Sequence, residues 1–199
     1  MLIASLARAV CLTLGLVLAW PTLADEPPAS SLAAETVING CRIAPKTQCP
    51  GANLRHADLK AANLAGANLA GADLRRADLR MANLTGANLD GADLTGARLN
   101  RGYLAGASLK NARLVAADFE LARLMRADFS GADLTAASLE AARAAYAVFH
   151  NTQLIAANLQ ETKFNGANFW NARMEHCVIR YAIFPEAFFE GCQGCPHDW

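Results

Sequence analysis

A period of five residues runs without interruption through most of the chain. The pattern Ala-Asn/Asp-Leu-x-x fills residues 52–56, 57–61 and 62–66 and continues from there. With the Leu position taken as the centre of each pentad, centres fall at every fifth residue from Leu54 to Phe189, which makes 28 pentads with no insertion or deletion. Such regularity indicates a chain built by stacking one small unit many times.

Two of the five positions are nearly fixed. The centre is Leu in 18 pentads and Phe in seven, and the position two before it is Ala except at Gly102, Thr152, Thr162 and Cys177. The other three positions vary and are mostly polar. Two residues of every five therefore face a core, and the small one implies a close approach of the backbone.

A period of five fits neither an α-helix, which repeats every 3.6 residues, nor a plain strand, which repeats every two. A helix would scatter the Leu residues around its circumference, and the many Asn, Asp and Gly residues oppose long helices. The regular solution is a chain that turns a corner every five residues. Each flat side is then a very short strand, which predicts an all-β fold.

The A-[D/N]-L-x-x array resembles the pentapeptide-repeat family from Ala52 to Gly191. The resemblance implies a right-handed quadrilateral β-helix with four pentads, or 20 residues, in each coil. It also implies about seven coils, spaced like ordinary strands at about 4.8 Å. A coil of 20 residues would stack one ladder of large side chains in the core: Leu69, Leu89, Leu109, Phe129, Phe149, Phe169 and Phe189.

The corners carry two further predictions. The Asn and Asp residues before each centre are expected to be structural and to bond to the backbone at the corners. The Gly residues two after the centre gather on two of the four faces, as in Gly66 and Gly86 on one face and Gly71 and Gly91 on the next. Since Gly permits positive φ, we expect these two faces to use a different turn type.

The N-terminal segment has the features of a signal peptide. A short start with one positive charge precedes an apolar stretch from Ala9 to Trp20, and small residues lead to a cleavage site between Ala24 and Asp25. An uncleaved anchor is the alternative, although the apolar stretch is short for a membrane span. We therefore expect a periplasmic or secreted bacterial protein without a transmembrane segment after cleavage. The predicted divisions are the signal peptide (1–24), a linker and N-terminal cap (25–51), the β-helix (52–191) and a C-terminal tail (192–199).

Five cysteines remain after cleavage, and their connectivity does not follow from the sequence. By resemblance to the cap of similar exported proteins, Cys41 and Cys49 are interpreted as a disulfide loop that closes the first coil. Cys177 occupies an Ala position, so it is either a small core residue or a disulfide partner of Cys192 or Cys195.

The Cys192-x-x-Cys195 pair suggests two kinds of chemistry. A redox site of the thioredoxin kind would need a βαβ context, which the pattern does not predict. A zinc site could use Cys192, Cys195 and His197 with His176, but a single CxxC motif lacks a second pair. For an exported chain a disulfide is the better hypothesis, so no metal and no cofactor are expected.

Positive side chains line up if the coil has 20 residues. Arg123, Arg143 and Lys163 would then form a ladder, with Tyr103 below them and Arg126 nearby. The ladder could bind an anionic ligand or polymer. The alternative is a solvated face balanced by acids such as those listed here: Glu120, Glu140 and Glu161. The neutral balance of the chain favours the solvated face.

Outward positions become apolar near the C-terminus, at Ile155, Trp170, Val178, Tyr181, Ile183 and Phe188. An exposed patch of this kind indicates a partner or a tail that folds back. We expect the short tail to pack across the last coil.

The composition narrows the functional classes. Lys plus Arg and Asp plus Glu each total 18, which argues against a dedicated nucleic-acid binder. No nucleophile–base arrangement and no phosphate-binding loop is present, so we expect no enzymatic activity. The favoured hypothesis is an exported interaction scaffold, monomeric, with an unknown protein partner in the cell envelope.

Two other hypotheses stay open. Some pentapeptide-repeat proteins mimic DNA and bind a type II topoisomerase (gyrase), and these relatives are cytosolic, acidic on the outside and dimeric through a C-terminal helix. The present chain has mixed charge and a predicted signal peptide instead. The other hypothesis is a redox or zinc-binding protein that uses Cys192 and Cys195.

Overall fold

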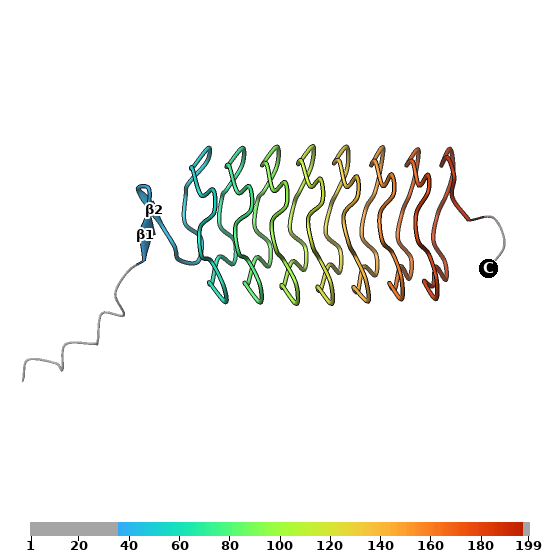
Figure 1. Ribbon diagram of the computed structural model, residues 1–199, viewed down its shortest axis with the longest axis horizontal. Coiled ribbons are helices and arrows are strands. Elements are labelled where there is room, and N and C mark those ends of the chain that lie inside the picture. The colour runs from blue at the N-terminus through green and yellow to red at the C-terminus, as the bar shows by residue number, and fades with distance from the viewer. Residues whose placement is uncertain (1–35, 197–199) are drawn as a thin grey trace, which may run out of the picture. The chain divides into compact units, whose positions relative to one another are not determined.

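The computed structural model describes residues 36–196. The predicted signal peptide with its cleavage site, the linker up to residue 35 and His197 lie outside the described residues. From about residue 46 onward the chain winds into a regular stack of coils, which follow one another along one axis (Figure 1). Within the described range, no helix is long and apolar enough to cross a membrane.

Parallel bridges join neighbouring coils, and each bridge connects residues that are 20 apart, such as Asn53 with Asp73. At this bridge the Leu54 N–H donates to the Asp73 carbonyl (2.8 Å), and the Asp73 N–H donates to the Ala52 carbonyl (2.9 Å). The predicted coil of four pentads is therefore confirmed. The bridges run from Gln48 to Gln193, so the pairing starts before the predicted boundary at 52 and continues past 191.

The core is the predicted narrow column. All the Leu centres are buried, and so are nearly all the Ala residues two positions before a centre. The Phe part of the predicted ladder stacks ring on ring, with centroid distances of 5.1 Å from Phe129 to Phe149, 4.8 Å from Phe149 to Phe169 and 5.2 Å from Phe169 to Phe189. Each buried Leu or Phe removes apolar surface from water and contributes about 1.5–3 kcal/mol. Summed over the stack, this column is the main source of stability.

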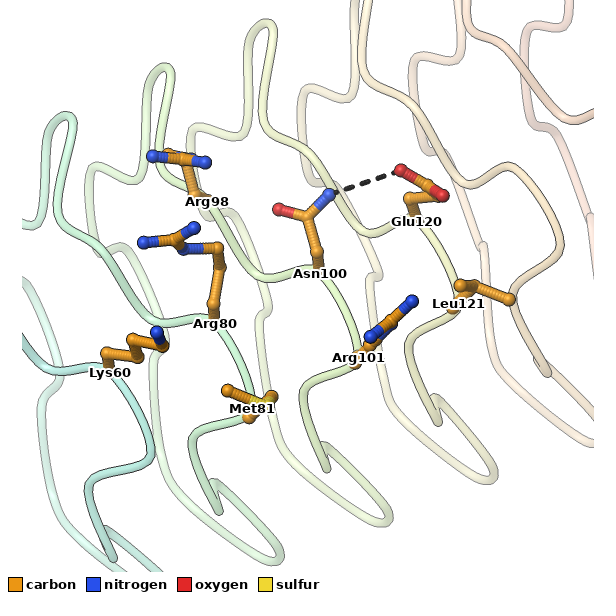
Figure 2. Close-up of a pocket in the computed structure, with 8 residues that line it drawn as sticks. All are labelled: Lys60, Arg80, Met81, Arg98, Asn100, Arg101, Glu120 and Leu121. Atoms are coloured by element: carbon orange, nitrogen blue, oxygen red, sulfur yellow. Dashed lines mark hydrogen bonds between the residues drawn. The ribbon is translucent and has the colours of Figure 1, made fainter.

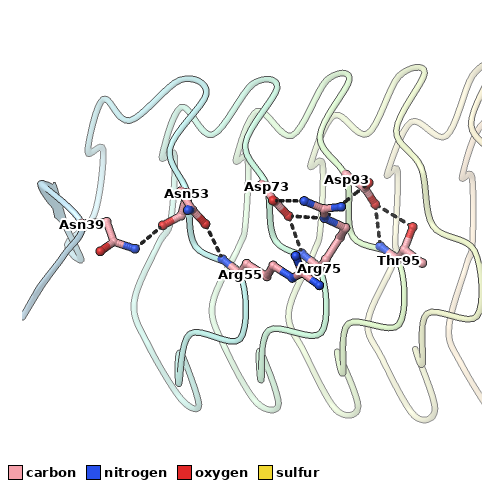
Figure 3. Close-up of polar contacts among 7 residues, drawn as sticks. All are labelled: Asn39, Asn53, Arg55, Asp73, Arg75, Asp93 and Thr95. Carbon is pink, nitrogen blue, oxygen red and sulfur yellow. Dashed lines mark hydrogen bonds and ion pairs between the residues drawn. The ribbon is translucent and has the colours of Figure 1, made fainter.

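The Asn and Asp residues before the centres bond to the backbone, as predicted. The Asn53 Oδ1 accepts the Arg55 N–H (3.3 Å), and the Asp93 Oδ1 accepts the Thr95 N–H (3.0 Å) (Figure 3). The same two-residue step recurs through the array, so these side chains satisfy a corner N–H that the neighbouring coil does not reach.

The prediction of two turn types is wrong. The residue two after the centre has positive φ at every corner from Lys46 to Gly191, whether or not it is Gly. Ala116, for example, has φ 55° and Gly131 has φ 69°. All corners share one turn, because the coil-to-coil hydrogen bonds hold non-Gly residues in the left-handed region at a cost of about 1–2 kcal/mol each. The Gly residues relieve that strain locally and do not mark a separate geometry.

The polar exceptions in the Ala column follow one rule. The Thr152 Oγ1 donates to the Phe129 carbonyl (2.8 Å), and the Thr162 Oγ1 donates to the Leu139 carbonyl (2.6 Å). The Cys177 Sγ lies 2.7 Å from the Leu154 carbonyl oxygen in the same arrangement. The buried hydroxyls of Thr152 and Thr162 and the half-buried thiol of Cys177 therefore fit this column, because the coil below offers each of them an acceptor.

The N-terminal end carries a small hairpin of β1 (Val37–Ile38) and β2 (Cys41–Arg42), paired antiparallel with Ile38 opposite Cys41. Cys41 is buried. The Asn39 Nδ2 donates to the Asn53 carbonyl (2.8 Å), which ties the hairpin to the first coil (Figure 3). Cys49 stands one pentad before Leu54, so it takes a centre position at the start of the stack.

At the other end, the start of the tail continues the path of the coils. The Gln193 N–H donates to the Ala172 carbonyl (2.9 Å) and its carbonyl accepts the Met174 N–H (2.8 Å). Cys195 is buried, with its Sγ 3.1 Å from the Met174 Sδ. Residues 192–195 therefore lie against the last coil, as expected for this part of the tail.

Candidate functional site

The predicted ladder of cations is present on one wall of the β-helix, which we call the cationic wall: Tyr103, Arg123, Arg143 and Lys163. Successive bridges join Tyr103 to Arg123, Arg123 to Arg143 and Arg143 to Lys163, so the four residues lie one above the other on consecutive coils. All four are exposed. The Arg123 guanidinium lies 4.8 Å from the centre of the Tyr103 ring, which is a cation–π contact.

The cationic wall gives up a structural hydrogen bond. On the same wall, one coil closer to the N-terminus than Tyr103, the Asn83 Oδ1 accepts the Thr85 N–H (3.1 Å). Arg and Lys side chains have no acceptor, so Arg123, Arg143 and Lys163 cannot make this bond. A hydrogen bond of this kind contributes about 1 kcal/mol. Consecutive coils therefore carry cations at a position where Asn or Asp would be more stable.

Some cations elsewhere on the rod are paired with carboxylates. Arg75 bonds Asp73 through its Nε (2.7 Å) and its Nη2, and it also reaches Asp93 (3.8 Å) (Figure 3). The hydrogen bond from Arg75 lowers the pKa of the Asp73 carboxyl from 3.8 to about 2. Arg80 likewise holds the pKa of Asp78 below its usual value.

The cations of the wall lack such partners. Among residues 36–196, Arg123, Arg143 and Lys163 make no ion pair with a carboxylate, and neither does Arg126 on the adjacent corner. The acids expected to balance them, Glu120, Glu140 and Glu161, do not pair with them either. The wall is therefore an uncompensated positive surface.

Two shallow grooves flank the corner that carries Arg101. One lies at the lower end of the cationic wall and is lined by Met81, Arg101, Tyr103, Leu121 and Arg123. The other groove lies on the opposite side of the corner, on the wall that precedes the cationic wall along the chain (Figure 2). We call it the Arg101 groove, and its lining is Lys60, Arg80, Met81, Arg98, Asn100, Arg101, Glu120 and Leu121.

The Arg101 groove was not among the sites predicted from the sequence. Its cations come from three columns of the repeat, which a search along single columns does not combine. A map of all outward residues on a 20-residue coil would have placed Arg80, Arg98 and Arg101 together. The unusual environment of Asn100, by contrast, depends on side-chain contacts that no sequence pattern shows.

The five cysteines within residues 36–196 form two pairs and one free thiol. The structure bonds Cys41 to Cys49 and Cys192 to Cys195, and Cys177 is the free cysteine of the described chain. The alternative bond from Cys177 to the tail is therefore not formed. Burial raises the pKa of the Cys177 thiol, which reduces its reactivity at neutral pH.

The structure does not assemble the zinc ligands considered above. Cys192 and Cys195 are bonded to each other, and His197 lies outside the described residues. No group of three or more His, Cys, Asp or Glu side chains in residues 36–196 is close enough to hold a metal ion.

The last two coils expose apolar side chains, which we call the apolar collar: Trp170, Val178, Tyr181, Ile183 and Phe188. Val178, Ile183 and Phe188 are 50%, 45% and 62% exposed, and each bridges to the coil below at the position where Asn or Asp usually stands. Ile155, also predicted to lie in this patch, is only half-buried lower on the rod.

Comparison with known proteins identifies the repeat. Eight copies of the family model described as pentapeptide repeats match the chain, with matches that extend over residues 52–193. A trypsin-treated form of QnrB1, a plasmid-mediated fluoroquinolone resistance protein, has the same fold: 14% identity, coverage of 72% of this chain and 84% of that chain, and a TM-score of 0.60. HetL, a pentapeptide-repeat protein involved in heterocyst differentiation regulation in the cyanobacterium Nostoc, is 23% identical over 75% of this chain and 88% of its own, with a TM-score of 0.47. No curated protein matches the chain.

The family match covers more than half of the sequence, and the 20-residue coil with its buried Leu and Phe column has the form that the repeat dictates. The chain therefore belongs to the pentapeptide-repeat family, whose fold is a right-handed quadrilateral β-helix.

Proposed function

We propose that this protein is an exported, non-enzymatic scaffold of about seven coils that binds a protein partner in the cell envelope through the apolar collar. The observation that carries the proposal is the exposure of Val178, Ile183 and Phe188 on successive walls of the last coil. Apolar patches of this kind on a soluble surface are typical of interaction sites. The two grooves on the walls of residues 36–196 are shallow, which favours binding over catalysis.

Export is supported by the signal peptide predicted for residues 1–24 and by the cysteine pairs Cys41–Cys49 and Cys192–Cys195, since disulfides persist in oxidising compartments. The test is the intact mass of the protein from the envelope fraction after thiol alkylation without reduction. A chain that starts at Asp25 with one alkylated cysteine, Cys177, is expected once the fold is opened by denaturant. A full-length cytosolic chain with six alkylated cysteines would overturn export.

The collar is tested by cross-linking in intact cells followed by quantitative capture. Replacing Ile183 and Phe188 with Ser should reduce the specifically cross-linked partner at least tenfold. Met125→Ser, which removes an exposed apolar side chain away from the collar and from both grooves, is the matched control and should leave capture unchanged. Equal loss in both variants would contradict a role for the collar. Sedimentation of the purified protein tests the expected monomer.

Binding to a type II topoisomerase is the second candidate, favoured by the fold that this chain shares with QnrB1. A purified gyrase supercoiling assay separates the two candidates. Protection or inhibition of gyrase at micromolar protein would support the second candidate, whereas no effect together with collar-dependent capture supports the scaffold. A redox or zinc function of Cys192 and Cys195 predicts that Ser at both positions abolishes activity; the scaffold predicts only a weakened C-terminal cap.

A further inference from the structure

The Arg101 groove combines positive charge with a buried oxygen that lacks a hydrogen bond. Arg80 is committed to Asp78, which accepts from the Arg80 Nε at 2.7 Å. Lys60, Arg98 and Arg101 are exposed, and none of them forms an ion pair with a carboxylate within residues 36–196. Glu120 is the single acid of the lining, so cations dominate the groove.

Asn100 lies between these cations and two carboxylates. Its Nδ2 donates to the Asp118 Oδ2 (2.6 Å) and, at 3.5 Å, to the Glu120 Oε2. Because both neighbours on that side are acceptors, the amide must turn its nitrogen toward them. The Asn100 Oδ1 then points the other way, toward the side where Arg80 and Arg98 lie (Figure 2).

The Asn100 Oδ1 is buried and accepts no hydrogen bond in the described structure. A buried carbonyl oxygen without a donor costs about 1–3 kcal/mol. When the long Arg80 and Arg98 side chains beside this oxygen move aside, a ligand for this groove would gain affinity by offering a hydroxyl or N–H donor to Asn100 as well as an anionic group to Arg98 and Arg101.

The backbone of the wall cannot recruit an extended peptide. The N–H groups of Arg98, Leu99 and Arg101 already donate to the carbonyls of Ala77, Asp118 and Glu120. Addition of a strand needs a free edge, and this wall offers none. Recognition must come from side chains alone, with Met81 and Leu121 as apolar contacts at the sides of the groove.

We propose that the Arg101 groove binds an anionic carbohydrate, a sugar that carries carboxylate or phosphate groups beside free hydroxyls. The anion pairs with Arg98 and Arg101, and a hydroxyl donates to the Asn100 Oδ1. The second groove lies on the other side of Arg101 and leads to Arg123 on the cationic wall, so an oligosaccharide would extend across the corner. The inference is independent of the apolar collar, which lies on the last two coils.

Titration calorimetry on the purified chain at low salt tests the proposal. The probes are tetragalacturonate, its neutral methyl ester, galacturonate, glucose 6-phosphate and tetraglutamate. Tetragalacturonate should bind at least tenfold more tightly than tetraglutamate, which has the charge without the hydroxyls, and the methyl ester should not bind. Monomers that bind as tightly as the tetramer would identify a free sugar acid or sugar phosphate as the ligand; binding of the tetramer alone would identify a polymer.

Variants assign the contacts. Arg98→Ala and Arg101→Ala should each raise the Kd for tetragalacturonate at least tenfold. Arg113→Ala removes an exposed, unpaired arginine from the same repeat position as Arg98 but on another wall, and it should change the Kd less than twofold. Asn100→Ala should weaken tetragalacturonate binding without changing tetraglutamate binding. Circular dichroism of each variant controls for folding.

Three outcomes would overturn the inference: no binding of any sugar acid or sugar phosphate at millimolar concentration, equal affinity for tetraglutamate and tetragalacturonate, or equal losses for Arg113→Ala and Arg98→Ala. Equal affinity for the two tetramers would indicate an electrostatic surface for acidic peptides instead. None of these outcomes bears on the collar, whose cross-linking test is separate.

Discussion

The coils before residue 98 and the coils after it share one backbone but use it differently. From Asn53 to Asp93 every residue before a centre is Asn or Asp, and every centre from Leu54 to Leu94 is Leu. Beyond them, the same outward column contains Arg, Lys, Tyr, Ser, Gln, Val, Ile and Phe, and Phe enters the core. The bridges nevertheless keep the 20-residue register throughout.

The comparison separates what the fold requires from what it permits. The centres are buried in both regions, apart from Ile179 and Phe189 in the last coil, because the chain winds around a filled column. The Asn or Asp acceptor is stabilising but dispensable, because the coil-to-coil hydrogen bonds persist where it is absent. Positions released from this role carry the cationic wall and three residues of the apolar collar, Val178, Ile183 and Phe188.

The largest expected effect concerns the core, where the two regions differ in side-chain size. Phe149→Ala removes a ring stacked between Phe129 and Phe169 and should reduce the free energy of unfolding by about 4 kcal/mol. Leu89→Ala, in the Leu region, should cost about 3 kcal/mol. Urea unfolding followed by circular dichroism measures both, and a loss below about 1 kcal/mol for Phe149→Ala would mean that the Phe column is not a tightly packed core.

The outward column gives the sharpest test of the comparison. Asn83→Ala removes the acceptor for the Thr85 N–H and should lower the free energy of unfolding by about 1 kcal/mol. Arg143→Asn restores an acceptor three coils further along the same line of bridges and should raise the free energy of unfolding by about the same amount. Urea unfolding of both variants checks these values.

Arg143→Ala is the control for this pair, because it removes the cation without adding an acceptor and should give no gain. If Arg143→Asn is not more stable than Arg143→Ala, the acceptor does not contribute on this wall. In that case the cations of the cationic wall do not reduce the stability of the fold.

A smaller effect depends on pH and concerns the compensated charges of the first region. The pKa of Asp73 in the fold is about 2, below its ordinary value of 3.8, because Arg75 stabilises the carboxylate. The stabilisation is therefore complete above about pH 4 and is lost as the pH falls toward 2. The free energy of unfolding of Asp73→Asn should decline less than that of the wild type between pH 5 and pH 2. Parallel declines would show that the ion pair contributes nothing, as is common for exposed pairs.

The sequence was sufficient to predict the pentad and the backbone-bonding role of Asn and Asp, because each depends on a strict period of five residues. The 20-residue coil and its core ladder were implied by the resemblance to the pentapeptide-repeat family. It misled us at the corners, where Gly was taken to mark a distinct turn although Ala116 and His56 adopt the same positive φ. The cationic ladder could be predicted once the coil length was assumed. The Arg101 groove could not, because the orientation of Asn100 depends on two carboxylates of the next coil.

The smallest expected effect concerns Cys177, and measuring it shows whether this thiol is structural or reactive. Its Sγ bonds the Leu154 carbonyl as Thr152 and Thr162 bond the carbonyls beneath them, so Cys177→Thr should change the free energy of unfolding by about 0.5 kcal/mol or less. Cys177→Ala removes the thiol's hydrogen bond to a carbonyl that still accepts the Ala157 N–H (3.2 Å), and it should cost about 1 kcal/mol. Thermal unfolding of both variants, compared with the rate of alkylation of the native thiol, tests this role. If the thiol reacts as fast in the folded protein as in urea, Cys177 is accessible to solvent. The Ala position of this coil would then differ from the same position on the preceding coils, which is buried.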